Sequence, residues 1–370
     1  MAERAASAGQ RVLIVDRREH IAGNAYDEAD QHGVLIHRYG PHLFHTNAEK
    51  VYRYLSRFTA WREYQHQVRA VVDGELVPVP INLETINTLH GTQFETADQV
   101  QRHLSDVSES RELPRTSEDA VVSKVGRDLY ERLFRGYTRK QWGLDPSALD
   151  ASVCGRIPVR YDRTDRYFDD RFQAMPQDGY TELFRQLLDN RLIDRQLGVD
   201  YSLIRDVVDY RTLVWTGPVD EYFGFNRGRL PYRSLNFEFR SLPTPDGELI
   251  QPAGVLNYPS EAVPYTRSAE YRHFTGQPGL TSTISYEYPS AEGDPYYPIP
   301  RPENRALYKR YAALAAAERD VVFVGRLARY QYLNMDQVVA QALHAAALRF
   351  GPDAAWLDPA ILAHPERAAA

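Results

Sequence analysis

A short apolar run that ends in an acidic residue lies very near the start of the chain. Residues 11–16 read Arg-Val-Leu-Ile-Val-Asp, and the alanine-rich segment 2–6 before them has high helix propensity. This order is typical of a helix that leads into a buried parallel strand, so the start of the chain predicts an α/β fold. A core strand with no part in ligand binding would have the same pattern.

Asp16 also limits what can precede this strand. In dinucleotide-binding folds an acid that ends the second strand holds the ribose, and the Gly-x-Gly-x-x-Gly turn lies about 20 residues before it. Counting back from Asp16 reaches a point before Met1. We therefore expect the glycine turn and the first strand to be missing, and the first residues to be the back half of the helix that follows them.

The composition narrows the class of protein. With 370 residues, 43% hydrophobic and 25% charged, the chain is expected to form two or three packed modules. A net charge of −6 gives no reason to expect nucleic acid or an anionic membrane as partner. Cys154 is the only cysteine, which excludes an internal disulfide and favours a cytoplasmic location. We find no apolar stretch of the about 18 residues that a membrane span needs.

The rest of the chain changes character several times. Residues 68–80 have the pattern of a β-hairpin, and residues 83–142 have a mostly helical period. From 155 to 302 the chain is rich in proline, glycine, tyrosine and short β-type runs, which predicts an antiparallel sheet. A strand at 321–324 and a helix at 335–350 follow, the helix capped by Asn334.

Eight segments, spread over almost the whole chain, combine aromatic, basic, glycine and proline residues in distinctive strings. They are HIAGNAYD (20–27), YGPHLFHT (39–46), YTRKQWG (137–143), GRIPVR (155–160), DRYFDDRFQAMPQDGY (165–180), NYP with PYTR (257–259 and 264–267), EGDPYYPIP (292–300) and GRLARYQYLNMD (325–336). In this order they resemble successive motifs of bacterial UDP-galactopyranose mutases. One string alone would carry little weight, whereas eight in family order are hard to obtain by accident.

The resemblance implies a reaction and a fold. In that reaction reduced FAD uses its N5 atom to displace UDP from the sugar, which recloses as a five-membered ring. UDP-galactopyranose and UDP-galactofuranose thus interconvert with no net redox change. The product would supply galactofuranose for cell-surface glycans. It also implies a Rossmann-like FAD-binding domain with an inserted helical domain and an antiparallel sheet domain for substrate. We expect these domains at 1–65 with 190–225 and 305–350, at 83–145, and at 66–82 with 146–189 and 226–304, followed by a tail at 351–370 that looks dispensable after about Pro359.

The diphosphate of the substrate would need fixed positive charge, because its bridging oxygen gains charge as the sugar leaves. Taken alone, each arginine of this chain would most often be a solvated surface charge. The resemblance assigns the diphosphate to five residues: Arg156, Arg267, Tyr167, Tyr297 and Tyr332. It also places Arg156 in a mobile lid, and it makes Arg156, Arg267 and His45 the catalytic candidates.

The uracil base and the sugar would need stacking surfaces and polar contacts. Phe134 and Tyr137 match the family's nucleotide platform, and Trp142 matches a tryptophan near the sugar. Three aromatic residues at this spacing would otherwise be a helical core stripe. Asn257 and Asn334 match residues near the diphosphate or the sugar, although Asn257 could equally be a turn asparagine.

The FAD site is assigned by the same resemblance. Histidines 42 and 45 would otherwise form a capping loop before a helix with Asn47 as its N-cap, and no third ligand suggests a metal. Asp16 should hold the adenosine ribose, and the start of the last helix should favour anionic flavin. The expected FAD-binding residues are Asp16, Gly23, Asn24, His42, His45, Arg326 and Met335.

Three departures from the family pattern stand out. Without the glycine turn the chain should bind FAD poorly and expose apolar sheet surface. Three explanations for the missing turn are a start codon assigned too far downstream, a deliberate fragment and a pseudogene-like product. The first is favoured because every later motif is intact. Ala22 stands where the family usually has glycine, which is tolerable only if φ there is not positive. Asn334 replaces an aspartate of some members and keeps the helix cap.

Two other functions compete with the mutase. A flavin amine-oxidase-like oxidoreductase would share the fold, but its pocket would be apolar or shaped for an amine, whereas this chain offers two arginines for a diphosphate. A UDP-sugar-binding remnant without cofactor is supported only by the late start. The resemblance names UDP-galactose as substrate and a flavin reductant as partner, and it leaves the reductant's identity and a homodimer open.

Overall fold

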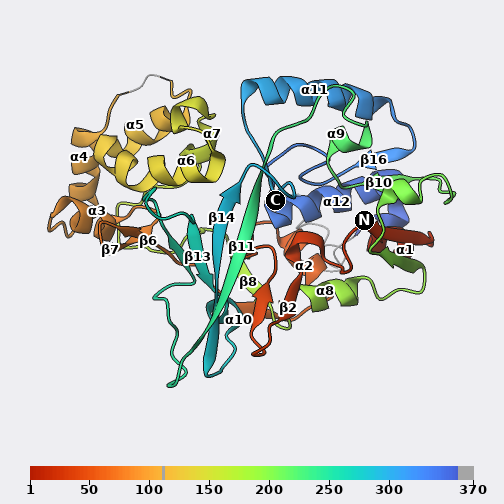
Figure 1. Cartoon of the computed structure of the whole chain (residues 1–370), viewed down its shortest axis with the longest axis horizontal. Coiled ribbons are helices and arrows are strands. Elements are labelled where there is room, and N and C mark those ends of the chain that lie inside the picture. The colour runs from red at the N-terminus through yellow and green to blue at the C-terminus, as the bar shows by residue number, and fades with distance from the viewer. Residues whose placement is uncertain (111–112, 357–370) are drawn as a thin grey trace, which may run out of the picture.

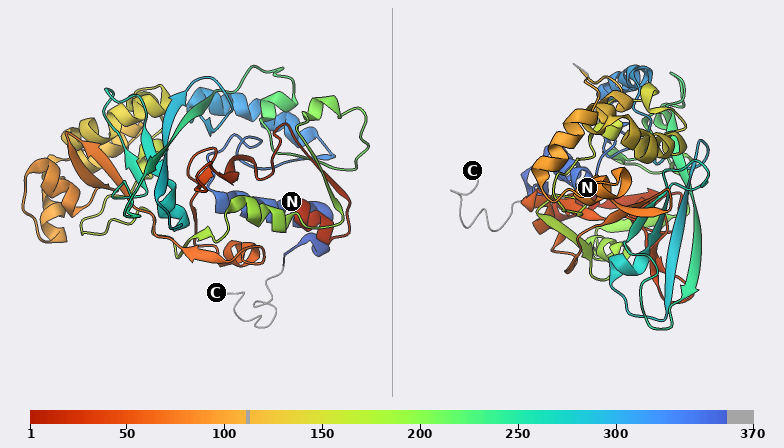
Figure 2. Two further views of the ribbon diagram at one scale, coloured as in Figure 1. Left: turned by 60° about the horizontal axis from the view of Figure 1, so that its bottom comes forward. Right: turned by 90° about the vertical axis from the view of Figure 1, so that its left-hand side faces the viewer.

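Three parts of the molecule lie side by side in the computed structural model, which describes residues 1–110 and 113–356 (Figure 1). A helical part at one end is followed by a large twisted sheet in the middle, and an α/β part lies at the other end. The left-hand view of Figure 2 shows the same order from a second direction, and its right-hand view looks at the molecule from the helical end. Within the described residues no helix has the length and apolarity needed to cross a membrane.

The α/β part contains parallel strands, which confirms the predicted fold class. Strand β1 (Val12–Asp16) pairs in parallel with β9 (Ile193–Leu197), and β10 (Leu213–Trp215) pairs in parallel with β16 (Val321–Phe323). The two pairs form separate sheets in the described part of the chain. Strand β1 is only half-buried, with Leu13 42% exposed, so its apolar surface is less covered than a central strand requires.

The helices of this part pack around these strands. The predicted helix before β1 and the predicted last helix are both confirmed. The helices and 3-10 turns are α1 (Ala2–Ser7), η1 (Gly23–Ala25), α2 (Glu49–Leu55), α8 (Tyr180–Leu187), η4 (Tyr201–Leu203), α9 (Val219–Tyr222), α11 (Pro302–Ala317), α12 (Met335–Phe350) and η5 (Pro352–Ala354).

The middle of the molecule is a seven-stranded sheet in the order β15-β11-β14-β13-β12-β6-β7. Every neighbouring pair is antiparallel except β12 with β6, so the predicted antiparallel sheet is confirmed. The predicted hairpin is β6 with β7, turned by Asp73 and Gly74 at positive φ. Its strands are β6 (Val68–Val72), β7 (Glu75–Val79), β11 (Tyr232–Pro243), β12 (Val255–Asn257), β13 (Arg267–Glu270), β14 (Thr281–Ser290) and β15 (Tyr297–Pro298), and α10 (Tyr271–Thr275) follows β13.

The helical part confirms the expected insertion between β7 and the later strands. Capping boxes begin α3, α4 and α5, because the side chains of Asn82, Thr96 and Thr116 accept backbone N–H groups and the third helical residue bonds back. The elements are α3 (Leu83–His90), α4 (Ala97–Val107), α5 (Ser117–Leu129), the π-helical turn η2 (Tyr130–Arg135), α6 (Gly136–Trp142), η3 (Pro146–Ala148) and α7 (Ser152–Gly155).

A second, smaller antiparallel sheet corrects two local predictions. It has the order β4-β8-β5, from β4 (Phe44–Thr46), β8 (Phe172–Pro176) and β5 (Trp61–Glu63), and a hairpin of β2 (Asp27–Ala29) with β3 (Leu35–His37) lies in the same part of the chain. His45 therefore lies in a strand and not in a loop. Asn47 is not a helix cap: its side chain bonds Asp170 and the backbone of Arg171, and α2 begins after Ala48.

The chain after α12 is packed as far as the structure describes it, contrary to the prediction of a tail from residue 351. Trp356 is 6% exposed and meets the ring of Tyr54 edge-on at 5.7 Å between centroids. Burial of a whole indole contributes stability, so residues 351–356 belong to the core around α2 and α12. The segment after Pro359, predicted to be dispensable, lies outside the described residues.

Candidate active site

A cavity of about 110 Å³ lies where the helical part meets the seven-stranded sheet. Nine residues that were predicted to contact substrate line it together, from seven different segments of the chain. They are Phe134, Tyr137, Trp142, Arg156, Tyr167, Asn257, Arg267, Tyr297 and Tyr332. The fold thus gathers positions that are 198 residues apart at the extremes (332 − 134) into one cavity.

Helix α6 and strand β13 face each other across this cavity. The π-helical turn η2 runs directly into α6, which presents Tyr137 and Trp142. The Nη2 atom of Arg267, on β13, donates a hydrogen bond of 3.0 Å to the hydroxyl of Tyr137. Trp142 is 7% exposed, so one side of the cavity is a dry aromatic wall. The arginine and the aromatic wall are therefore fixed relative to each other.

Glu287 is a site residue that the sequence did not reveal. It lies directly opposite Arg267 on the neighbouring strand β14, and its Oε2 atom is 3.2 Å from Nε of Arg267. Its side chain is fully buried; burial raises the pKa of Glu287, and the Arg267 guanidinium opposes that shift. Only its place between Tyr286 and Tyr288, in an alternating strand, could have suggested an inward-facing acid.

Three guanidinium groups surround a stacked pair of tyrosines at the cavity. The rings of Tyr297 and Tyr332 stack with centroids 5.6 Å apart and planes 14° apart. The guanidinium carbon of Arg156 lies 4.2 Å from the Tyr332 centroid, and that of Arg326 lies 4.9 Å from it. Burial acts to raise the pKa of Tyr332, but Arg156, Arg326 and Arg267 outweigh it and lower the pKa of this phenol.

This arrangement suits an anion with several oxygens. Arginines offer fixed forks of N–H donors, and a phenol beside cations is a strong hydrogen-bond donor. Tyr332 is 39% exposed and Arg156 is exposed, so the positive group opens to solvent on that side. A diphosphate could enter there and reach Arg267 inside.

Comparisons with known proteins agree with this chemistry. The family model described as UDP-galactopyranose mutase matches residues 132–332, which contain the whole cavity apart from three positions on β6, β7 and the turn after β7. The chain is 39% identical to the probable UDP-galactopyranose mutase of Klebsiella pneumoniae, over 94% of this chain and 90% of that protein. This chain belongs to the UDP-galactopyranose mutase family.

Other matches place the chain within that family. It is 35% identical to the dTDP-fucopyranose mutase of Escherichia coli, over 91% of this chain and 92% of that protein. A solved structure of reduced UDP-galactopyranose mutase shares the fold, with a TM-score of 0.73 and 15% identity over 94% of this chain and 90% of that one. A model of an NAD(P)-binding Rossmann-like domain matches residues 1–58. The family is one of isomerases, so the chain is an enzyme.

The predicted flavin residues of this mutase-family chain fall into two groups. The first lies at the carboxyl end of β1, where the Arg18 backbone N–H donates to Asp16 at 2.9 Å and the Arg18 side chain donates to Asn24 at 2.8 Å. In doubly wound folds ligands bind at this edge of the parallel strands. Gly23 follows β1 and Gly325 follows β16. Both have positive φ, and no atom lies within 4 Å of the place where a Cβ would stand. Both let a ligand approach the backbone closely, so the residues present fit a dinucleotide.

The second group lies beside the cavity. Burial lowers the pKa of His42 to about 4, so the ring is neutral at pH 7. Its Nδ1 atom is 2.8 Å from the carbonyl of Gly40, which assigns the proton to Nδ1 and leaves Nε2 as an acceptor. Arg326 donates to the carbonyl of Leu333, and Met335 packs between two hydrophobic clusters. This group could support a flat ring system next to the tyrosine pair.

His45 and Asn334 lie outside the cavity lining. The Nδ1 atom of His45 is 2.8 Å from Asp170, and its ring stacks on Phe168 at 3.6 Å between centroids. Asn334 is exposed at the start of α12, where its N–H donates to Gln337. The described residues hold no cluster of three or more histidine, cysteine or acidic side chains that could bind a metal.

Ala22 has a left-handed backbone conformation, which alanine rarely adopts. Its φ is 72° and its ψ is −4°, in the left-handed region, and Gly23 after it also has positive φ. An alanine there costs roughly 1–2 kcal/mol, because its Cβ approaches the carbonyl oxygen. The condition under which alanine would replace glycine without strain is therefore not met, and the chain carries a strained alanine beside its predicted flavin contact.

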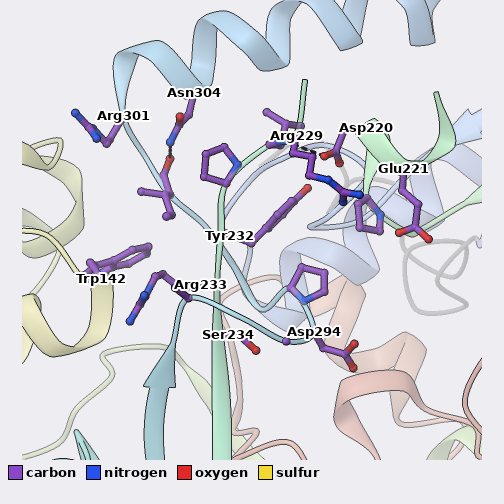
Figure 3. Close-up of a pocket in the computed structure, with 18 of the residues that line it drawn as sticks. Trp142, Asp220, Glu221, Arg229, Tyr232, Arg233, Ser234, Asp294, Arg301 and Asn304 are labelled. Atoms are coloured by element: carbon purple, nitrogen blue, oxygen red, sulfur yellow. Dashed lines mark hydrogen bonds between the residues drawn. The ribbon is translucent and has the colours of Figure 1, made fainter. Parts of the chain in front are cut away.

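A larger cavity of about 590 Å³ lies on the other side of Trp142 (Figure 3). It is lined by Arg229, Arg233 and Asp220 among others, and none of the other predicted site residues reaches it. Its charges are of both signs, and Asp220 already accepts the backbone N–H of Leu230 at 2.8 Å. The candidate site is the smaller cavity, because its lining combines two arginines and several tyrosines with no carboxylate among the lining residues.

Proposed function

We propose that the chain interconverts UDP-galactopyranose and UDP-galactofuranose with reduced FAD and no net redox change, supplying galactofuranose for cell-surface glycans. The observation that carries the proposal is the group of three guanidiniums around the stacked Tyr297 and Tyr332, two of which, Arg156 and Arg267, line a cavity with aromatic walls. Family membership supports the same reaction. An amine-oxidase-like oxidoreductase does not call for this cluster of positive charge. A UDP-sugar-binding remnant would keep the cluster and would differ from the mutase in binding no flavin.

The arginines would act on the departing UDP. When the bond between sugar and phosphate breaks, negative charge grows on the β-phosphate oxygen. Arg156 and Arg267 are arranged to meet that charge, and phenolic hydroxyls of Tyr167, Tyr297 and Tyr332 would donate to the non-bridging oxygens. Stabilisation that grows with the charge lowers the barrier, and it also keeps UDP in place until the sugar has reclosed.

The aromatic side of the cavity would hold the rest of the substrate. Phe134 and Tyr137 offer a surface for uracil, Trp142 lies toward the sugar, and Asn257 contributes an amide from the end of β12. Tyr137 would then have two roles, because its hydroxyl also holds Arg267. Asn334 would act only after a movement of the start of α12, since it lies outside the cavity lining.

FAD would be held by the two groups of residues described above. Asp16, Gly23 and Asn24 would bind its adenosine side, and His42, Arg326 and Met335 would contact its ring, with His45 behind them. When bound and reduced, the flavin supplies the nucleophilic N5 atom. The neutral His42 can accept a hydrogen bond through Nε2 from a flavin N–H, and so favour the reduced form.

Conversion of UDP-galactofuranose tests this proposal. The protein is loaded with FAD, reduced with dithionite without oxygen, and the nucleotide sugars are separated chromatographically; dTDP-fucopyranose is offered in parallel because a relative acts on it. We expect UDP-galactopyranose to form only with reduced flavin, and flavin to be recovered unchanged. Flavin oxidation in step with turnover would favour the oxidoreductase, and a protein that binds UDP but retains no flavin would favour the remnant. No product from a flavin-loaded, reduced protein would contradict the mutase proposal.

A further inference from the structure

Lys140, on the face of α6 that turns away from the cavity, has an unusual set of partners. Its ammonium group lies within hydrogen-bond distance of four backbone carbonyl oxygens, those of residues 258, 260, 263 and 265, at 2.6, 2.8, 2.8 and 2.8 Å. An ammonium has three N–H donors, so they are shared among four acceptors. All four acceptors belong to the loop that joins β12 to β13.

That loop connects two residues of the candidate site. Asn257 ends β12 on one side of it, and Arg267 begins β13 on the other. Helix α6, which carries Lys140, also carries Tyr137 and Trp142. Lys140 therefore links the helix of the aromatic wall to the loop between the two polar residues opposite.

Two further contacts show that the loop is seated closely on the helix. A Cβ at Gly136 would lie 2.4 Å from the carbonyl oxygen of Pro259, so only glycine allows the approach. Arg139 forms an ion pair of 3.2 Å with Glu261, but both side chains are about half exposed, so that pair contributes little. Within this contact, Lys140 is charged and partly buried, and burial lowers its pKa to about 8.

We infer that Lys140 is a positioning residue that fixes the 258–265 loop on α6, so that Arg267 and Asn257 are held at the right distance from Tyr137 and Trp142 to bind the UDP part of the substrate. The inference rests on the proposed function, because it assumes that this cavity holds UDP. Backbone carbonyls in a loop otherwise bond water and allow the loop to move. Four of them bonded to one cation make the loop move with the helix.

Binding of UDP to the flavin-free chain tests the inference, because it does not depend on turnover. Lys140→Met keeps the length of the side chain and removes the charge, and we expect the Kd of UDP to rise about tenfold or more, since displacements near 1 Å weaken aligned contacts strongly. Hydrogen exchange of the amides in 258–265 should speed up. With reduced FAD, the KM for UDP-galactofuranose should rise along with the Kd.

Gly136→Ala provides a second variant that leaves the lysine in place. The added methyl must push the loop away from the helix, so the same rise in Kd and the same faster exchange are expected even if Lys140→Met folds poorly. Arg139→Ala, on the same helix and loop, is the matched control and should change the Kd less than twofold. Lys140→Arg should recover part of the affinity, because it restores a cation.

The outcomes separate this inference from the proposed function. If the wild-type chain binds UDP and both Lys140→Met and Gly136→Ala bind it equally well, the positioning role is wrong and the proposed function stands. If exchange in the loop is unchanged in Gly136→Ala while its UDP affinity falls, the role of the loop is equally wrong. A wild-type chain that binds no UDP would overturn the proposed function and this inference together.

Discussion

In the middle of the molecule seven hydrogen-bonded strands form one sheet, whereas the four parallel strands of the α/β part form two separate pairs. The sheet and the helices inserted next to it bring nine predicted substrate residues to one cavity. The predicted flavin residues of the α/β part lie in two groups, one at the end of β1 and one beside the cavity. The residues predicted to bind substrate thus converge in one cavity, whereas those predicted to bind flavin lie in two separate places.

The two parts differ in the contacts that hold their polar groups in place. On the substrate side, a cross-strand ion pair with the buried Glu287 and a hydrogen bond to Tyr137 fix Arg267. At β1 half of Leu13 is exposed, and Ala22 nearby is strained, so less packing holds the groups in place. We therefore expect UDP binding to be independent of flavin, and the flavin side to respond more to local changes of backbone and burial.

The largest effect is expected for Arg267→Ala. The change removes a guanidinium from the cavity and leaves Glu287 buried without its partner, which should raise the pKa of Glu287 further and cost about 3 kcal/mol of stability. The Kd of UDP should rise by about 100-fold, measured by titration calorimetry.

Arg267→Ala with Glu287→Gln should recover stability in urea unfolding but not UDP binding. Recovery of UDP binding would show that Arg267 acts only through the fold. Arg240→Ala, at an exposed arginine on β11, is the control.

Acid should destabilise the chain through buried histidines. Burial lowers the pKa of His37 and His66 to about 3 and that of His42 to about 4, whereas in the unfolded chain they titrate near 6.5. Between pH 6.5 and 4 the unfolded chain binds more protons, so stability is lost as pH falls, by about 1.4 kcal/mol per pH unit for each histidine. The free energy of unfolding of His66→Gln, measured in urea at several pH values, should fall less steeply with decreasing pH than that of the wild type, by about 1.4 kcal/mol per pH unit. His32→Gln, at an exposed histidine, is the matched control.

Tyr137→Phe separates the two roles of that residue. The ring is kept for stacking, but Arg267 loses the acceptor at 3.0 Å. Loss of this bond should cost about 1 kcal/mol, which corresponds to a roughly fivefold higher Kd for UDP. Tyr130→Phe is a matched control, because the buried Tyr130 hydroxyl has no hydrogen-bond partner among the residues that the structure describes, and its loss should leave UDP binding unchanged. If the two changes raise the Kd of UDP equally, the hydrogen bond between Arg267 and Tyr137 does not contribute to UDP binding.

Ala22→Gly tests the strain on the flavin side. Glycine accepts the left-handed conformation at no steric cost, so the variant should be more stable by about 0.5–1 kcal/mol after the greater entropy of the unfolded chain is subtracted. Thermal unfolding measures this gain. Ala25→Gly, in the same turn but without positive φ, should lose stability instead. A loss in both variants would mean that the turn is not strained.

Much of the fold could be predicted from local patterns. The helix at 335–350, the hairpin at 68–80 and the helical insertion follow from periodicity and turn residues, which act within a few positions of the chain. The residues of the cavity were predicted by resemblance to family motifs, and the structure brings nine of them together. Spacing alone would have left these arginines and tyrosines as surface charges and core residues.

What the sequence did not reveal depends on partners far away in the chain. The buried pair of Glu287 with Arg267 needs the strand register, and the ammonium of Lys140 needs the path of a loop more than a hundred residues later. The φ of Ala22 and the packing of Trp356 are likewise set by tertiary contacts. No local pattern specifies these features.

The most direct test compares UDP with UMP in the flavin-free protein. If the arginines at the cavity hold a diphosphate, UDP should bind once per chain, and UMP, which has one phosphate fewer, should bind at least about tenfold more weakly. Adding FAD should leave the UDP affinity within about twofold. Equal affinity for UDP and UMP, or UDP binding that appears only with FAD, would contradict the account of a substrate side that is assembled independently of the flavin.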